Sequence, residues 1–567
     1  MTARRRSFFS LPLACHQWLP SAEVTFWCLL LLLLPLFIAL SFDFGITWDD
    51  QIQQEYGKHI FNFYTSGFQN TVARHYSNLY LYGGFFEFCN VLMSKLLPFL
   101  DEYDARHLCN SIFGWLAFCF TGLLGRRLYG PGVGLIAVLL LITAPRFVAD
   151  CMNNSKDLPF ATGYVASLYA LTFVRRRYPY FTYKVLAGVL SALAVTMNIR
   201  MGVVFLFGLT GLLLLALVWK DKYCRNTLGY SNWPAWLTLA SAFGFGVLIA
   251  MVLGTLFWPW ALASPLSRPF LALKEIAHFH QWHGTLLFNG KWLQDVDVPR
   301  HYILTWYAIG MPLPQLVGFG LALLLFIRRV EIWRPKLRPI KGRPDGRILT
   351  GLLLASVFLP LAIAMSIRPI LYDGLRHLLF IATPMTVLAA AAWFYLIRTS
   401  NHLKIANSDL PLGRGLVAAL LAICLIHPIE FMLREHPNQT VYFNELIGGT
   451  RGAFLRYEMD YWGNSYKQAV DRLRVEAIRM GRPLRIGATN GSHIVAQYAA
   501  RYPEALHFIA DDAPQDYHLW LLRDAPHFVP VLLAQPDLVD RITADGVALC
   551  LVFRGNGPSN PAFEAAP

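Results

Sequence analysis

The run Ala22-Glu-Val-Thr-Phe-Trp-Cys-Leu-Leu-Leu-Leu-Leu-Leu-Pro-Leu-Phe-Ile-Ala-Leu-Ser-Phe42 decides the class of fold. It supplies the roughly 20 predominantly apolar residues that a helix needs to cross a bilayer. The whole chain of 567 residues is 55% hydrophobic and only 15% charged, which excludes an ordinary soluble protein. We therefore predict a polytopic α-helical membrane protein with about eleven spans of this length. The predicted spans lie at residues 22–42, 107–124, 131–147, 158–174, 185–199, 201–219, 236–257, 308–327, 347–366, 377–397 and 413–431.

The formal net charge of +14 indicates how the chain is oriented in the membrane. Lys and Arg crowd into alternate short loops, which is typical of the cytoplasmic side of membrane proteins. This distribution predicts a cytoplasmic N-terminus and argues against a nucleic-acid partner. The basic groups are Arg4 to Arg6, Arg126 and Arg127, Arg175 to Arg177 with Lys184, the group Lys220, Lys222 and Arg225, and the cluster between Arg328 and Arg347.

One segment, residues 83–99, is ambiguous because it is short and carries Glu87, Asn90 and Lys95. If it crossed the membrane, every later basic loop would face the outside. We therefore expect an interfacial or re-entrant helix on the membrane surface. Residues 43–106 then form one long external loop.

The last part of the chain has the composition of a soluble domain. We expect residues 1–432 to form the membrane domain and residues 433–567 to form a small extracytoplasmic α/β domain. Short apolar-rich runs predict strands, and one longer amphipathic run predicts a helix. The predicted strands are residues 484–488, 518–522 and 547–553, and the predicted helix is residues 466–480.

An acidic pair, Asp49-Asp50, follows the first predicted span. Apolar residues recur at near-helical spacing after the pair, so Thr47 is expected to be the N-cap of an amphipathic helix. The pair then has two interpretations. It could only stabilise the helix dipole, which is worth about 0.3–1 kcal/mol per acid. Alternatively it is functional, because carboxylates at a membrane edge are costly to desolvate.

The next external loop favours the functional interpretation. It carries Asp157 at the start of an apolar run, beside Lys156. Arginines recur at the same predicted level of the membrane, and guanidinium groups bind phosphate in bidentate fashion. Acids beside several such cations indicate a site for a lipid phosphate or pyrophosphate leaving group. The arginines are Arg106, Arg146, Arg200, Arg368 and Arg376.

The ordered motifs resemble the GT-C superfamily of polyprenol-dependent glycosyltransferases. The similar branch contains protein O-mannosyltransferases and aminoarabinose transferases, in which an acidic pair lies in the first external loop and an Asp in the second. The segments that match that branch are Trp48-Asp-Asp50 and Asn153-Asn-Ser-Lys-Asp-Leu-Pro159. The chain also resembles a bacterial subgroup of the superfamily. The segments that carry this resemblance are Leu287-Phe-Asn-Gly290, Tyr372-Asp-Gly-Leu-Arg-His377, Val441-Tyr-Phe-Asn-Glu-Leu-Ile-Gly-Gly449 and Asp460-Tyr-Trp-Gly-Asn-Ser-Tyr466.

The resemblance implies an enzyme that takes a sugar from a polyprenyl phosphate and passes it, with inversion, to an acceptor lipid, glycan or protein. It implies that Asp49 is the general base, that Asp50 orients the acceptor or binds a divalent metal, and that Asp157 supports the sugar or the base. The family pair often ends in Glu where this chain has Asp50, so the role of the second acid is open. The resemblance also implies a multi-pass protein of the cell (inner) membrane.

The chemistry of the cations complements these roles. We expect Arg106, Arg200 and Arg376, with Lys156, to stabilise the charge on the leaving phosphate. No cysteine or histidine spacing predicts a metal site.

Two other classes of protein compete with this interpretation. A transporter or lipid flippase would favour ionisable residues near the middle of the spans and repeated halves. A non-catalytic scaffold would leave the membrane-edge carboxylates without a role. The sequence favours the glycosyltransferase and leaves the sugar and the acceptor open.

Overall fold

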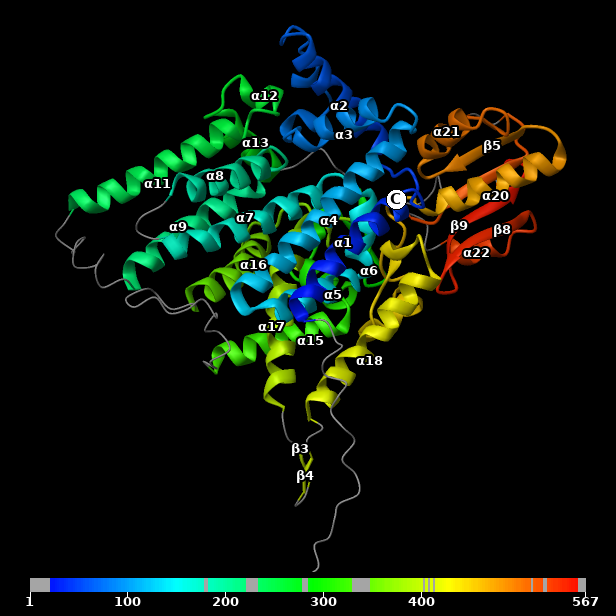
Figure 1. Ribbon diagram of the computed structural model, residues 1–567. Coiled ribbons are helices and arrows are strands. Elements are labelled where there is room, and N and C mark those ends of the chain that lie inside the picture. Colours follow the sequence, from blue (N-terminus) through cyan, green and yellow to red (C-terminus); the bar gives the residue numbers. More distant parts are fainter. Residues whose placement is uncertain are drawn as a thin grey trace, which may run out of the picture.

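The computed structural model describes most of the chain (Figure 1). The described residues are 21–177, 182–220, 233–277, 284–328, 347–400, 403–405, 408–410, 413–510, 513–523 and 528–558. Several of the basic groups that predicted the orientation lie outside these residues. They are Arg4 to Arg6, Lys222 and Arg225, and the part of the last cluster from Arg329 to Arg343.

Within the described residues, six helices are long and apolar enough to cross a membrane. Two bent pairs of helices bring the number to as many as eight if each pair is one span. The multi-pass helical class is therefore confirmed, while the count of about eleven spans remains a prediction. The six are α1 (Ala22–Leu40), α4 (Glu102–Tyr129), Met201–Trp219 within η4 (Met201–Val203) and α9 (Val204–Lys220), α16 (Arg347–Ile367), Arg376–Thr399 formed by η7 (Arg376–Ile381) and α17 (Ala382–Thr399), and α18 (Gly413–Arg434).

The bent pairs explain why two predicted spans differ from the structure. α5 (Pro131–Ile142) meets α6 (Pro145–Asn153) at 75°, and α14 (Tyr302–Gly310) meets α15 (Leu313–Ile327) at 118°. A proline begins or nearly begins the second helix of each pair, and a proline cannot continue a preceding helix without loss of a hydrogen bond. Both helices of each pair are apolar, so hydrophobicity alone predicts one continuous span where the structure has a bend.

The centre of the bundle is α17, which packs against α4, α5 and α15. Its residues Ala389–Ala392 are fully buried. Small side chains allow helices in membranes to approach closely, which is the main source of packing energy where lipid offers no hydrophobic driving force. Gly318 on α15 shows the same feature, since a Cβ there would lie 2.6 Å from the Trp393 indole nitrogen.

A layer of shorter helices lies at one end of the bundle (Figure 1). α2 (Asp50–Thr65) buries Tyr56, Ile60 and Phe63, which agrees with the amphipathic helix predicted after the acidic pair. α3 (Phe85–Leu96) occupies the ambiguous segment and packs on α2 and α4. It is not among the candidate spans, so the expectation that this segment does not cross is consistent with the structure.

The remaining described elements join these layers. The helices are α7 (Asp157–Arg177), α8 (Tyr183–Met197), α11 (Trp233–Leu253), α12 (Pro259–Leu262), α13 (Arg268–Ala277) and α19 (Gly449–Ala453). Two antiparallel hairpins pair β1 (Thr285–Phe288) with β2 (Lys291–Gln294), and β3 (Leu403–Ile405) with β4 (Ser408–Leu410).

The C-terminal region is built on a five-stranded sheet in the order β6-β5-β7-β9-β8. β5 runs parallel to β6 and β7, whereas β9 runs antiparallel to β7 and β8. The strands are β5 (Leu484–Thr489), β6 (Leu506–Phe508), β7 (Tyr517–Leu521), β8 (Leu538–Ala544) and β9 (Val547–Arg554), with helices α20 (Ser465–Met480), α21 (Ser492–Arg501) and α22 (Val529–Leu533). The predicted strands and helix of this region are confirmed.

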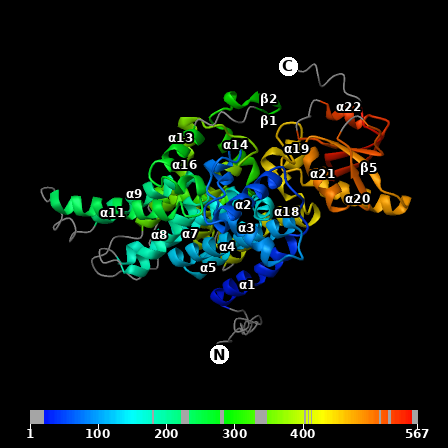
Figure 2. The same ribbon diagram turned by 90° about the horizontal axis from the view of Figure 1, so that it is seen from above.

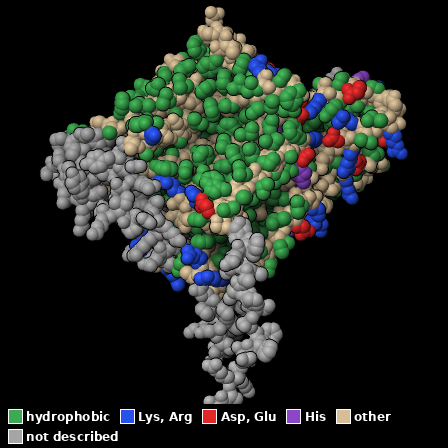
Figure 3. Space-filling view, in the orientation of Figure 1, with side chains coloured by type: hydrophobic (Ala, Val, Ile, Leu, Met, Phe, Trp, Pro, Cys, Tyr) green, Lys and Arg blue, Asp and Glu red, His purple; other side chains and the backbone are tan. Residues whose placement is uncertain are grey.

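The C-terminal sheet stands to one side of the bundle, beyond α18 (Figures 1 and 2). The chain between α18 and the sheet turns back over the bundle, because Val441, Tyr442 and Phe443 are fully buried in the same core as the helices. The boundary at residue 433 thus remains a prediction. The face in Figure 3 is hydrophobic over the helices, whereas charged side chains gather on the C-terminal region. This contrast is what a membrane-embedded bundle with an external region requires.

Candidate active site

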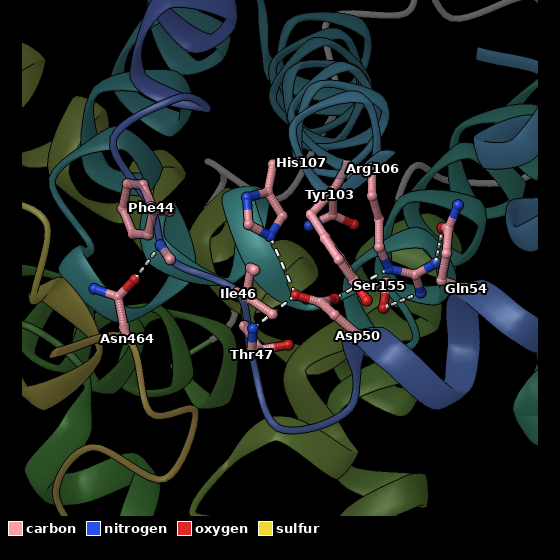
Figure 4. A network of polar contacts seen from close by, with 12 residues as sticks. Phe44, Ile46, Thr47, Asp50, Gln54, Tyr103, Arg106, His107, Ser155 and Asn464 are labelled. Atoms are coloured by element: carbon pink, nitrogen blue, oxygen red, sulfur yellow. Dashed lines mark hydrogen bonds and ion pairs between the residues drawn. The ribbon is translucent and has the colours of Figure 1, made fainter. Parts of the chain in front are cut away.

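The acidic pair divides into one buried and one accessible carboxylate. Asp50, the first residue of α2, has a side chain that is 1% exposed. Its carboxylate accepts the backbone N–H of Thr47 at 2.7 Å, contacts Arg106 Nε at 3.0 Å and lies 3.2 Å from His107 Nε2 (Figure 4). The predicted N-cap at Thr47 is therefore wrong. Asp49 is the N-cap residue, and the Asp50 side chain reaches back to the preceding backbone instead.

Arg106 completes this buried layer from α4. Its guanidinium contacts both oxygens of Glu87, at 2.7 and 3.0 Å, and donates to Gln53 at 2.7 Å and Ser155 at 2.8 Å. The side chain is 1% exposed. Arg106 thus binds α2, α3 and the loop before α7 together, with its donors turned toward protein. Removal of one partner of such a buried pair costs about 3–5 kcal/mol.

Asp49 faces a cavity of about 230 Å³ at the same end of the bundle. The segments at the starts of α2 and α7, the turn at the start of η7 (Arg376–Ile381) and the segment before α20 supply most of its wall. The lining residues are Asp49, Ile52, Gln53, Ser77, Asn78, Leu79, Tyr82, Asn154, Lys156, Asp157, Arg200, Tyr372, Arg376, His377 and Trp462.

Two cations lie near the Asp49 carboxylate, at distances longer than a hydrogen bond. Its Oδ2 lies 3.9 Å from Lys156 Nζ and 3.7 Å from Arg376 Nη1, and the side chain is 27% exposed. Burial works to raise the pKa of Asp49, but the positive charges of Lys156, Arg376 and Arg523 together hold the pKa below its ordinary value. Asp49 is thus a charged carboxylate open to the cavity.

A second ion pair lines the opposite part of the wall. Asp157 begins α7, and its backbone N–H donates to Asn154 Oδ1 at 3.0 Å. Its carboxylate pairs with Arg200, whose side chain is 18% exposed, while that of Asp157 is 5% exposed. Arg200 therefore presents part of its guanidinium to the cavity, whereas Asp157 chiefly holds it in place.

Arg376 is positioned by residues to which the sequence assigned no role. Its Nη2 pairs with Asp373 at 3.0 Å, and its guanidinium lies 4.8 Å from the Tyr372 ring and 4.9 Å from the Trp462 ring. Asp373 and Trp462 belong to motifs that the sequence resemblance quoted, so a signal existed. Nothing in the sequence pointed to Arg523, which reaches Asp373 from the end of β7 at 2.8 Å.

The structure brings five of the predicted site residues together, and it separates two. The five that line the cavity are Asp49, Lys156, Asp157, Arg200 and Arg376. Asp50 and Arg106 lie beneath the wall and bind each other. The interpretation of Arg106 as a phosphate ligand does not fit this geometry, because its donors are taken by Glu87, Gln53 and Ser155. Asp50 is likewise a positioning residue.

The same contacts bear on a metal ion. In the part of the chain that the structure describes, no group of three or more His, Cys, Asp and Glu side chains is placed to hold one. The carboxylates of the cavity each face a cation, Asp49 toward Lys156 and Arg376, and Asp157 toward Arg200. A divalent cation would be repelled there, so these residues fit an anion better than a metal.

The fold and site define a multi-pass helical membrane protein with a cavity lined by three cations and an open carboxylate at one end of its bundle. No protein-family model and no curated protein matches the chain. Among solved structures, it is similar to ArnT from Cupriavidus metallidurans in the apo state, with 13% identity and a TM-score of 0.46 over 94% of this chain and 99% of the other.

Two further structures are similar along most of the chain. ArnT from the same organism bound to undecaprenyl phosphate gives 14% identity and a TM-score of 0.46, with the same coverage. The oligosaccharyltransferase AglB from Archaeoglobus fulgidus, in complex with an inhibitory peptide and a dolichol-phosphate, gives 10% identity and a TM-score of 0.44 over 88% of this chain and 70% of the other.

Proposed function

We propose that this protein is an integral-membrane glycosyltransferase of the cell membrane, which moves a sugar from a polyprenyl-phosphate donor to an acceptor on the extracytoplasmic face, with inversion. One observation carries the proposal. The accessible carboxylate of Asp49 shares a cavity with Lys156, Arg200 and Arg376 at the end of the bundle. A general base and a set of phosphate-binding cations are what such a transfer needs from the protein.

The cations suit the leaving group of the donor. Arg200 and Arg376 present guanidinium donors, and Lys156 supplies a compact charge. When the bond between the anomeric carbon and the phosphate oxygen breaks, negative charge grows on the phosphate. Donors that are already held in place stabilise this charge without reorganisation. The contacts of Arg376 with Asp373 and of Arg200 with Asp157 provide that fixed placement.

Asp49 is suited to remove the proton of the acceptor during the displacement. The acceptor oxygen forms a bond to the anomeric carbon, its proton passes to the Asp49 carboxylate, and the polyprenyl phosphate leaves. A lowered pKa keeps Asp49 ionised, so it is always ready to accept a proton. The acceptor hydroxyl becomes strongly acidic as its oxygen bonds to the oxocarbenium-like carbon, so even a weak base takes the proton late in the reaction.

The test uses the purified full-length protein in lipid nanodiscs with a panel of radiolabelled polyprenyl-phosphate sugars and a membrane extract as the source of acceptor. We expect transfer from one donor, and Asp49→Asn should lower its rate about 10²–10⁴-fold. Asp43→Asn is the matched control, because Asp43 lies on the same loop but pairs with His436 away from the cavity. Full activity of Asp49→Asn would refute the assignment, and movement of intact donor across vesicles would favour a flippase instead.

A further inference from the structure

A second hollow, of about 430 Å³, adjoins the cavity on the far side of Asp49. Asp49 and Ile52 line both spaces. The proposed base therefore stands in the wall between a space rich in cations and a second space. The residues that line the second hollow are Trp48, Asp49, Gln51, Ile52, Glu55, Tyr76 and His493.

The two spaces differ in charge. The hollow is lined by Asp49 and Glu55 and by no Lys or Arg, in contrast to the three cations of the cavity. Both carboxylates already have cationic partners, since Glu55 pairs with Lys58 at 2.7 Å and Asp49 lies 3.9 Å from Lys156 and 3.7 Å from Arg376. An acceptor phosphate in the hollow would lose part of its hydration and would meet no Lys or Arg in the lining, which is unfavourable for a charged group. The hollow thus suits a neutral molecule.

The uncharged groups of the hollow indicate what kind of molecule fits. Trp48, Tyr76 and His493 give it aromatic walls, and Gln51 and Glu55 give it hydrogen-bonding groups. Gln51 and Glu55 are four residues apart on α2, so they project from the same face of the helix. Aromatic rings pack on the C–H faces of pyranose sugars, while amide and carboxylate groups bind sugar hydroxyls in a fixed orientation.

The C-terminal region contributes one wall of the hollow. His493, in the first turn of α21, lies 3.0 Å from the backbone oxygen of Trp48 through its Nε2, and its ring meets the Trp48 ring edge-on at 5.3 Å. Gly491 permits this contact. It has φ +86, and a Cβ there would lie 2.9 Å from the Trp48 ring. The hollow is therefore built by two regions that are far apart in the sequence.

We propose that this hollow is the acceptor site and that the acceptor is a neutral, hydroxyl-bearing saccharide. The inference rests on the proposed function, since it takes Asp49 as the base. An acceptor hydroxyl in the hollow reaches Asp49 from the side away from the phosphate-binding cations. Attack from that side breaks the bond to phosphate and forms the new glycosidic bond on the opposite face of the sugar. Because the acceptor attacks opposite the leaving phosphate, the anomeric centre inverts, and the acceptor proton passes to Asp49.

The experiment compares three acceptors with the donor that the full-length protein uses. They are neutral di- to tetrasaccharides of glucose, galactose and mannose, a Ser/Thr-rich decapeptide, and a phosphorylated glycolipid in vesicles. The variants are Gln51→Ala and Glu55→Lys, and the control is Glu476→Lys on the outer face of α20, where Glu476 pairs with Arg479. Release of sugar from the donor to water is measured in parallel, because it needs the donor site but no acceptor.

We expect neutral saccharides to accept sugar, with the acceptor KM raised at least about tenfold by Glu55→Lys, the effect of losing one charge-assisted hydrogen bond. Donor KM and donor hydrolysis should stay unchanged in both variants. An unchanged acceptor KM in both variants would overturn the assignment of the hollow. Acceptance by the peptide or the phosphorylated glycolipid alone would overturn the substrate class. If Asp49→Asn still hydrolysed the donor, the role of Asp49 as the base would be refuted. The tests of the hollow with Gln51→Ala and Glu55→Lys do not depend on that result.

Discussion

Arg523 and Arg376 share one carboxylate. Asp373 accepts from Arg523 Nη2 at 2.8 Å and pairs with Arg376 Nη2 at 3.0 Å, and the Asp373 side chain is 4% exposed. Arg523 also donates to the backbone oxygen of Tyr461 at 3.0 Å and lies 4.8 Å from the Trp48 ring. The C-terminal sheet thus takes part in holding a cation of the cavity.

Replacement of Arg523 should therefore affect catalysis from outside the cavity. We expect Arg523→Gln to lower kcat/KM about tenfold, since a charge-assisted hydrogen bond is worth about 1.5–3 kcal/mol. In an Asp373→Asn background the same replacement should cost little, because the shared carboxylate is gone. A double-mutant cycle in kcat/KM measures this coupling, with exposed Arg541→Gln as the control. Additive effects would show that the two residues act independently.

Arg106 should control stability and not donor affinity. Arg106→Met leaves Glu87 and Asp50 buried without their cation, so we expect a loss of about 3–5 kcal/mol of unfolding free energy. Thermal unfolding of the purified protein measures it, and Arg451→Met, at an exposed arginine, is the control. If the variant kept its melting temperature but bound the donor weakly, Arg106 would be a phosphate ligand after all.

The pH profile should reflect the lowered pKa of Asp49. A carboxylate acts as a base only when ionised, so activity falls as the pH drops through its pKa. Because the pKa lies below the ordinary value, we expect the acid limb of kcat/KM at a lower pH than an ordinary aspartate would give. Lys156→Met removes one of the charges that lower the pKa and should move the limb to higher pH. Exposed Lys291→Met should not, and an unmoved limb in both would contradict the role of Lys156.

Replacement of Arg376 even by lysine should weaken phosphate binding. Its guanidinium reaches toward Asp49 and Asp373 through separate nitrogens, a fork that a lysine ammonium cannot reproduce. We expect Arg376→Lys to weaken inhibition by a polyprenyl phosphate, the leaving product of the proposed reaction, at least about tenfold, the loss of one charge-assisted contact. Inhibition constants for this product measure the effect. Equal inhibition of the variant and the original protein would remove Arg376 from the phosphate site.

The predicted orientation can be tested at the cavity itself. Ser77 is exposed and lines the cavity, whereas Asp157 is too buried to be a useful label position. An impermeant maleimide applied to intact cells should label Ser77→Cys but not Arg328→Cys, which lies at the end of α15 on the predicted cytoplasmic side. The reverse pattern would invert the whole topology.

Hydrophobic length and period predicted the helical class, and they also predicted three of the five strands of the C-terminal sheet. Those features are local, because a span or a strand is encoded by consecutive residues. The motif order predicted roles for Asp49 and Asp157, and the chemistry of the cations predicted roles for Lys156, Arg200 and Arg376. Local pattern did not reveal the bends between α5 and α6 and between α14 and α15, since both halves of each pair are apolar.

The sequence by itself determined that the chain is a multi-pass helical membrane protein and that acids and cations gather at one level of it. Only the tertiary structure decided which of them are free to react. Asp49 and Asp50 are neighbours with the same chemistry, yet the start of α2 turns one to the cavity and the other onto Arg106. The choice depends on partners from α3, α4 and the C-terminal sheet, which are far away in the sequence and meet only when the chain has folded.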